Sequence, residues 1–207
     1  MEQHVKITLS GVLSEGFSIG IKNLASLLVA TLLWIITIWI PYLNVGTTIA
    51  ITTIPIELSK GKIISPLFIF DAKYRQYMGE YFTLIGLMLL ALIPAYLFLI
   101  IPGIVVNIGW SLAIYILLDK GVAPGEAMIR SNKATYGYKW IIWGVGIILG
   151  VAYSIISLIF GLIPILGIIL NFALFLVYMV FSQGCNAIIY RKLVLGEDIQ
   201  ESNENLA

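Results

Sequence analysis

The chain has 207 residues, of which 60% are apolar and 11% are charged, with a formal net charge of +1 and a mean hydropathy of +1.00. Soluble domains carry about 25% charged residues, so this composition excludes an ordinary water-soluble globule. It indicates an integral membrane protein.

Three long stretches of the chain contain no Asp, Glu, Lys or Arg, and they predict its membrane-spanning part. They cover residues 23–56, 81–118 and 140–190 and hold 34, 38 and 51 residues. A helix crosses the hydrocarbon layer with about 20 residues, so each stretch suits a pair of helices. We therefore expect an all-α protein with six transmembrane helices in three hairpins, each preceded by a cytoplasmic amphipathic helix. These form one domain over residues 1–195, and an acidic tail follows at residues 196–207.

The first predicted element is an amphipathic helix that precedes the first hairpin. Its apolar stripe has helical spacing and consists of Leu9, Leu13, Phe17 and Ile21. Serine residues and Lys22 occupy the opposite face, so we expect this helix to lie in the headgroup layer.

The first predicted hairpin covers about residues 24–58, with its turn at Pro41, because proline breaks a helix. Its second helix places Asn44, Thr48 and Thr52 on one face. Amides and hydroxyls inside a membrane commonly hydrogen-bond neighbouring helices. They also suit the wall of a polar cavity, and the sequence leaves both interpretations open.

The segment between the first two hairpins predicts a helix from Pro66 to Glu80. Aromatic residues recur along it at helical spacing: Phe70, Tyr74, Tyr77 and Tyr81. An aromatic stripe beside Lys73 and Arg75 is typical of a helix that lies in the headgroup layer.

The second predicted hairpin covers about residues 81–118, with its turn at Pro102 and Gly103 and with Asn107 after the turn. Pro94 predicts a kink in its first helix.

The segment from Pro124 to Lys139 predicts a helix with a different stripe. Most of the stripe is small: Ala127, Ser131, Ala134 and Tyr138. Small residues let two backbones approach closely, so we expect this helix to pack on protein rather than on lipid. Glu126 and Arg130 lie one helical turn apart and predict an ion pair on another face.

The third predicted hairpin covers about residues 140–190, with its turn around Pro164. Its polar side chains are Asn171 after the turn and Gln183 and Asn186 near the inner end. Small residues form a ridge on its first helix: Gly146, Gly150 and Ser154. We expect the ridge to pack within one chain, although such faces serve contacts between chains as well, so the oligomeric state stays open.

The three predicted turns share an Ile-Pro pair followed by an asparagine. The pairs are spaced by 61 and 62 residues, and they are Ile40-Pro41, Ile101-Pro102 and Ile163-Pro164. This pattern favours a unit used three times. Short turns also favour proline for local reasons, so independent turns remain the alternative.

All 12 Lys and Arg residues lie on one side of the predicted hairpins, and none lies in the three turns. Basic residues beside membrane spans stay on the cytoplasmic side, so we expect both termini to be cytoplasmic. Residues 1–192 carry 12 basic and 7 acidic residues, a net charge of +5, which should attract anionic headgroups. The candidate headgroup contacts are Lys73, Arg75, Arg130, Lys133, Lys139, Arg191 and Lys192.

The sequence offers few residues for chemistry. His4 is the sole histidine and Cys185 the sole cysteine, so we expect no metal site, no cofactor and no nucleophile paired with a histidine base. An enzyme would have to use carboxylates at the predicted inner face: Glu57, Asp71, Glu80, Asp119 or Glu126. We expect a protein without enzymatic activity.

The run Ile101-Pro102-Gly103-Ile104, the series from Ala127 to Trp140 and the closing Tyr190-Arg191 resemble a widespread group of bacterial six-span membrane proteins of unknown function. Similar sequence forms the membrane domain fused to some glycerophosphoryl diester phosphodiesterases. The resemblance covers about residues 60–195. It implies a multi-span helical protein of the bacterial inner membrane, and it implies no catalytic residues, because the phosphodiesterase chemistry belongs to a separate soluble domain.

Two functions remain as predictions. The first is a membrane module that binds anionic lipid headgroups or a protein partner at its basic face, and not nucleic acid. The second is a transporter or channel for a small neutral or weakly polar solute, lined by the asparagines and threonines and formed by one chain or an oligomer.

Overall fold

The computed structural model describes residues 7–196, of which 84% are helical and none forms a strand. Four continuous helical stretches are long and apolar enough to cross a membrane: Ala72–Phe98, Ile100–Lys120, Lys139–Gly161 and Leu166–Leu195. A fifth appears if the two helices Leu9–Lys22 and Leu24–Thr37, bent by 79°, count as one span. The described residues therefore confirm an all-α fold with four or five helices that are long and apolar enough to cross a membrane, while six crossings are not confirmed.

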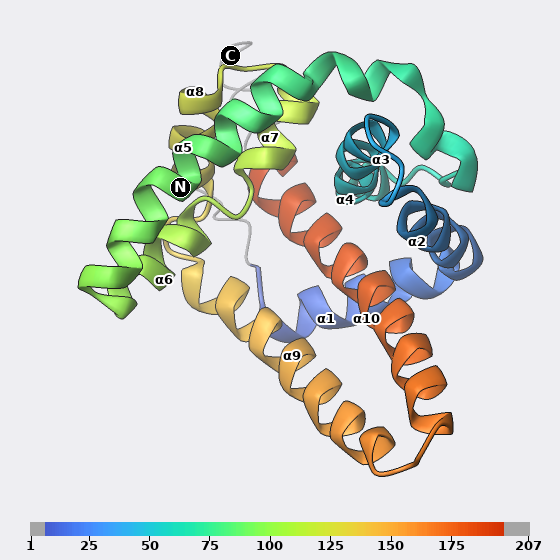
Figure 1. The fold of residues 1–207 in the computed structure, drawn as a ribbon. Helices are drawn as coiled ribbons and strands as arrows, with labels where there is room; N and C mark the ends of the chain where they lie inside the picture. Colours follow the sequence, from blue (N-terminus) through green and yellow to red (C-terminus); the bar gives the residue numbers. More distant parts are fainter. Residues whose placement is uncertain (1–6, 197–207) are drawn as a thin grey trace.

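The third predicted hairpin is present as α9 (Lys139–Gly161) and α10 (Leu166–Tyr190). The two helices meet at a turn around Pro164, and a ring contact of 5.1 Å between the centroids of Tyr153 and Tyr178 joins them. Figure 1 shows this hairpin projecting from the rest of the molecule. Leu162 at its tip is 82% exposed, which suits a tip that lies among lipid or at the far membrane surface.

The second hairpin consists of α5 (Met78–Phe98), α6 (Ile100–Gly109) and α7 (Ala113–Lys120). Its turn lies at Leu99, in extended backbone, and not at the predicted Pro102. Pro102 instead lies in the first turn of α6, where a missing backbone N–H leaves no hydrogen bond unmade.

The first hairpin is shorter than predicted. It consists of α2 (Leu24–Thr37), α3 (Leu43–Thr52) and α4 (Ile54–Ser59). The 14 residues of α2 span about 21 Å, whereas the hydrocarbon layer is about 30 Å thick. Arg75 also lies 6.0 Å from the ring of Tyr42, next to the Pro41 turn. The prediction that this turn and Arg75 lie on opposite membrane faces is therefore wrong.

The predicted helix from Pro66 to Glu80 is wrong as well. Two 3-10 helices, η1 (Pro66–Phe70) and η2 (Ala72–Tyr77), lie there, and α5 begins at Met78. The break is at Asp71, whose backbone is extended and whose carboxylate accepts a hydrogen bond of 3.0 Å from the amide of Lys73. Tyr74 and Tyr81 are buried in protein, so this stripe does not face lipid headgroups as predicted.

The segment after the second hairpin forms α8 (Pro124–Ala134), and its small residues Ala127, Ser131 and Ala134 are buried. The prediction that this face packs on protein is confirmed. The hydroxyl of Ser131 donates to the carbonyl of Gly109 at 2.7 Å and accepts from the amide of Leu112 at 3.2 Å. The Gly109 carbonyl and the Leu112 amide lie where the helix is interrupted between α6 and α7. Ser131 of α8 therefore supplies hydrogen bonds to backbone groups that the interruption leaves without helical partners.

Helix α1 (Leu9–Lys22) crosses α10 at a close approach of two backbones. A Cβ added to Gly184 would lie 2.2 Å from the carbonyl oxygen of Gly16. The buried face of α1 is Val12, Gly16 and Gly20, and Ile21 of the predicted apolar stripe is exposed. Leu9, Leu13 and Phe17 of the predicted stripe are partly buried against the core, so the stripe faces protein and not lipid headgroups as predicted. The closest contact with α10 is made by glycine, which carries no side chain.

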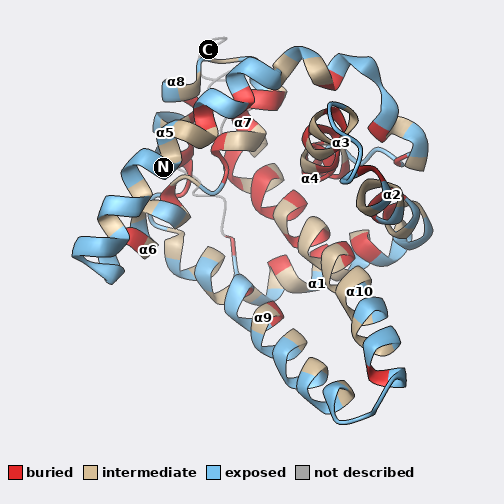
Figure 2. Cartoon of the chain, in the orientation of Figure 1, coloured by how far each residue is buried: buried red, intermediate tan, exposed pale blue. Residues whose placement is uncertain are grey.

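The buried core gathers at one end of the molecule, where α1, α4, α7, α8 and the end of α10 meet (Figure 2). The ridge of Gly146, Gly150 and Ser154 lies outside this core, and a Cβ added to either glycine meets no atom within 4 Å. The predicted packing of the ridge within the chain is therefore wrong. We call the core-bearing end of the molecule the charged end, because the buried carboxylate of Asp119 with its partner Lys60, and Arg191 and Lys192 after α10, lie there.

Candidate functional site

A buried carboxylate at the charged end joins the three hairpins. Asp119, the penultimate residue of α7, has a side chain that is 6% exposed and forms an ion pair with Lys60, which follows α4. The hydroxyl of Tyr190, at the end of α10, donates to the other oxygen of Asp119 at 2.7 Å. One carboxylate thus holds one segment from each hairpin, and we call Lys60, Asp119 and Tyr190 the carboxylate junction.

Arg191 contributes a second link beside this junction. Its Nε donates to the carbonyl of Ser59 at 2.6 Å and its Nη2 to the carbonyl of Leu58 at 3.0 Å. These carbonyls lie at the C-terminal end of α4, where a helix leaves its last carbonyls without partners. Arg191 was predicted as a headgroup contact, and the structure places two of its nitrogens on protein backbone.

Three of the six other predicted headgroup cations pair with carboxylates. Lys73 lies 3.2 Å from Asp71, Arg130 lies 2.5 Å from Glu126, and Lys192 lies 2.5 Å from Glu15. The predicted pair of Glu126 and Arg130 is thereby confirmed. Because these cations are distributed over η2, α8 and the end of α10, the structure does not bring the predicted set together on one surface.

One short stretch of the chain combines basic and aromatic side chains, at the end of α8 and the start of α9. We call it the basic aromatic surface, and it consists of Lys133, Tyr136, Lys139, Trp140 and Trp143. Tyr136 is 79% exposed and Trp140 is 80% exposed. The rings of Trp140 and Trp143 meet edge to face, 5.5 Å apart, and Lys139 donates to the side-chain oxygen of Asn132 at 3.0 Å. Sequence reasoning missed the three aromatic residues, although tryptophan beside lysine at the end of a charge-free stretch signals a membrane interface.

Two of the three polar candidates of the first hairpin, Asn44 and Thr48, link its two helices, and Thr52 bonds within α3. Thr48 accepts a hydrogen bond of 3.0 Å from the indole of Trp34, and Thr52 donates to the carbonyl of Thr48 at 2.8 Å. Asn44 donates to the carbonyl of Ile38 across the turn at 3.2 Å. The interpretation as helix contacts fits this group.

The other polar candidates lie elsewhere. Asn107 is exposed in a groove of about 360 Å³ between α6 and α9, together with Ser111. Asn171 has a buried side-chain oxygen that makes no hydrogen bond within the described chain. Gln183 and Asn186 are half-buried on α10. Within residues 7–196 no hydrogen bond joins Asn44, Asn107 and Asn171 to one another.

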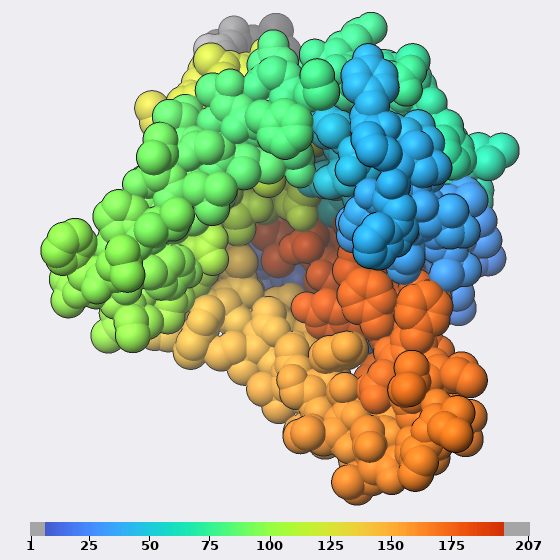
Figure 3. Space-filling view, viewed as in Figure 1, coloured from blue at the N-terminus to red at the C-terminus, as the bar shows by residue number. Residues whose placement is uncertain are grey.

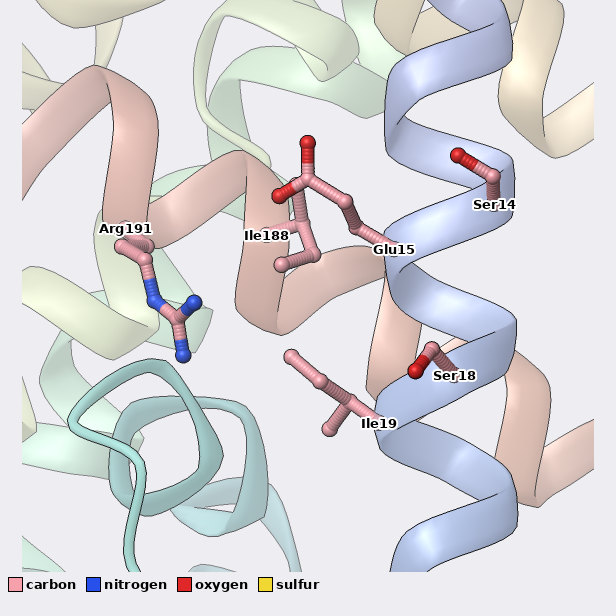
Figure 4. A pocket seen from close by; sticks show the side chains of 6 residues that line it. All are labelled: Ser14, Glu15, Ser18, Ile19, Ile188 and Arg191. Carbon is pink, nitrogen blue, oxygen red and sulfur yellow. The ribbon is translucent and has the colours of Figure 1, made fainter.

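A pocket of about 280 Å³ opens between α1 and the end of α10 (Figure 4). Its walls carry a carboxylate, a guanidinium and two hydroxyls, from Ser14, Glu15, Ser18 and Arg191, with Ile19 and Ile188 between them. In the part of the chain that the structure describes, no group of three or more His, Cys, Asp or Glu side chains is placed to hold a metal ion.

Comparison of the chain with protein-family models, with curated proteins and with solved structures finds no match.

Proposed function

We propose that this chain is a non-enzymatic integral membrane protein that binds anionic lipid headgroups at its charged end. The supporting observation is the basic aromatic surface. Tyr and Trp side chains concentrate at the level of the headgroups, and each nearby Lys or Arg adds about 1 kcal/mol of attraction to anionic lipid. Residues 7–196 carry 11 basic and 6 acidic residues, so the described chain keeps a charge of +5.

Lipid is a better ligand for this surface than a protein partner, because exposed aromatic rings beside lysine match the mixed apolar and anionic character of the headgroup layer. We also propose that the two long hairpins cross the bacterial inner membrane with both termini cytoplasmic, and that α2–α4 forms a shorter third hairpin beside them. The absence of Lys and Arg from the tips of the two long hairpins supports this orientation.

Brominated lipids test the proposal, because bromine quenches tryptophan only at close range. Replacing Trp34, Trp39 and Trp110 with phenylalanine leaves Trp140 and Trp143 as the sole emitters. In reconstituted vesicles, brominated phosphatidylglycerol should quench them more strongly than brominated phosphatidylcholine, and added salt should reduce the difference, because salt screens exposed charges.

A double lysine variant and a control variant test whether the preference for phosphatidylglycerol depends on the charge of this surface. The double variant of Lys133→Gln and Lys139→Gln should lower the preference for phosphatidylglycerol by up to about 30-fold, since two basic residues supply about 2 kcal/mol. Lys73→Gln removes one charge from η2, outside the basic aromatic surface, and should change the quenching little. Equal quenching by both lipids at all salt concentrations would overturn the proposal. An equal effect per charge at Lys73 would show that total charge, and not this surface, attracts the lipid.

A transporter or channel for a small neutral solute is the second candidate function. It is favoured by the groove that contains Asn107 and Ser111, and by the hollow that Figure 3 shows between α5–α6, α9 and α10. Proteoliposomes loaded with an osmolyte test it. Faster shrinkage or swelling with glycerol or urea than in empty liposomes, abolished by Asn107→Leu, would support transport, and equal rates would remove it.

A further inference from the structure

The pocket between α1 and α10 combines groups of opposite charge at the level where α10 leaves its membrane-spanning stretch. Glu15 and Ser18 come from α1, and Arg191 follows directly after α10. In Figure 4 the carboxylate of Glu15 and the guanidinium of Arg191 extend from their two helices into the same gap. In the membrane placement proposed above, on which this inference rests, the gap lies at the depth of the lipid headgroups.

Several polar atoms in the pocket are left without a protein partner within the described chain. Arg191 uses Nε and Nη2 on the end of α4, which leaves Nη1. Glu15 binds Lys192 through Oε1, which leaves Oε2. The hydroxyl of Ser18 forms no hydrogen bond to any atom of residues 7–196. The pocket therefore offers a hydroxyl donor and a charged acceptor on its α1 side and a guanidinium donor on the opposite side.

We infer that this pocket binds the headgroup of phosphatidylethanolamine. Its phosphate would accept hydrogen bonds from Arg191 and Ser18, and its ammonium would donate to Glu15, so that each charged group meets its opposite. A headgroup that carries only negative charge would face the Glu15 carboxylate. Choline is excluded on different grounds, because a quaternary ammonium cannot donate a hydrogen bond and prefers aromatic faces, and no residue that lines the pocket is aromatic.

Native mass spectrometry of the full chain tests this inference. The detergent-solubilised protein is mixed with equal amounts of phosphatidylethanolamine, phosphatidylcholine and phosphatidylglycerol, and the lipids that stay bound are counted. The wild type should retain phosphatidylethanolamine in preference to phosphatidylcholine. Glu15→Gln should lower that preference by about tenfold or more, which is the usual strength of a hydrogen bond to a charged group.

Two further variants separate a ligand role from a structural one. Lys192→Gln breaks the same ion pair as Glu15→Gln but keeps the carboxylate, so retention of phosphatidylethanolamine should stay the same or rise. Ser18→Leu fills the pocket and should abolish the preference, whereas Ser10→Leu, at an exposed position of α1 outside the pocket, should not.

Three results would overturn the inference. They are equal retention of the ethanolamine and choline lipids by the wild type, equal losses in Glu15→Gln and Lys192→Gln, and displacement of the lipid by soluble phosphoethanolamine at the lipid's own concentration. The last result would assign the pocket to a free headgroup compound. Quenching of Trp140 and Trp143 by brominated phosphatidylglycerol should be the same in Glu15→Gln as in the wild type, so failure here and failure of the proposed function are distinguishable.

Discussion

Removing the carboxylate of Asp119 should destabilise the protein, because this group joins all three hairpins. The hydrogen bond from Tyr190 to a charged, buried oxygen is worth about 1.5–3 kcal/mol. The ion pair with Lys60 adds only about 0–1 kcal/mol, because the Lys60 side chain is 34% exposed and water screens it. Asp119→Ala should therefore lower the free energy of unfolding by about 2–4 kcal/mol.

Unfolding in mixed micelles of detergent and sodium dodecyl sulfate measures this change. Tyr190→Phe removes only the hydrogen bond and should account for most of the loss. Glu126→Ala removes an exposed carboxylate that pairs with Arg130 one turn away, and should cost no more than about 0.5 kcal/mol. If Asp119→Ala and Glu126→Ala have the same effect, Asp119 does not hold the hairpins together.

Three other variants test the packing and the local electrostatics. Gly184→Ala should destabilise the protein by about 1–3 kcal/mol in the same unfolding assay, since its Cβ would meet a carbonyl of α1, while Gly146→Ala should be neutral or stabilising. Ser131→Ala should cost about 1–3 kcal/mol, because the hydroxyl serves a buried carbonyl and a buried amide at the break between α6 and α7. The amide of Lys73 lowers the pKa of Asp71 below its ordinary value of 3.8, so the stability that this contact provides is complete above that value and lost as the pH falls through the lower, folded pKa. Carboxyl chemical shifts measured during an acid titration should show this, and a midpoint for Asp71 at or above 3.8 would contradict it.

The two long hairpins could be predicted from the sequence, because exclusion of charge over about 40 residues leaves few alternatives to a pair of crossing helices. The same reasoning fails for the first hairpin. Residues 23–56 also contain no charge, yet α2 and α3 are short and the Tyr42 turn lies beside Arg75. Hydropathy reports which solvent a segment prefers, and the contacts with η1 and η2 that shorten this hairpin depend on the tertiary structure.

The candidate site was predictable only in its location. The sequence placed the basic residues on one side, but it could not show that Arg191 binds the end of α4, because that contact joins residues 132 positions apart. The sequence also could not show which aromatic residues are buried and which are exposed. Tyr74 is buried in protein and Tyr136 is exposed, and a tyrosine at helical spacing suits either environment. Asp71 was a signal that could have been used, since aspartate often starts a new turn by accepting from the backbone.

Labelling of single cysteines with a membrane-impermeant maleimide tests the central claim most directly, which is that the charged end and the tips of the two long hairpins lie on opposite sides of a membrane. The probes are Leu162→Cys at the exposed tip of the third hairpin and Tyr136→Cys on the basic aromatic surface, each in a Cys185→Ser background. In intact cells, we expect labelling of the cysteine at position 162 and none at position 136 until the membrane is permeabilised. Labelling of both positions in intact cells, or of position 136 alone, would contradict the structure's proposed placement in the membrane.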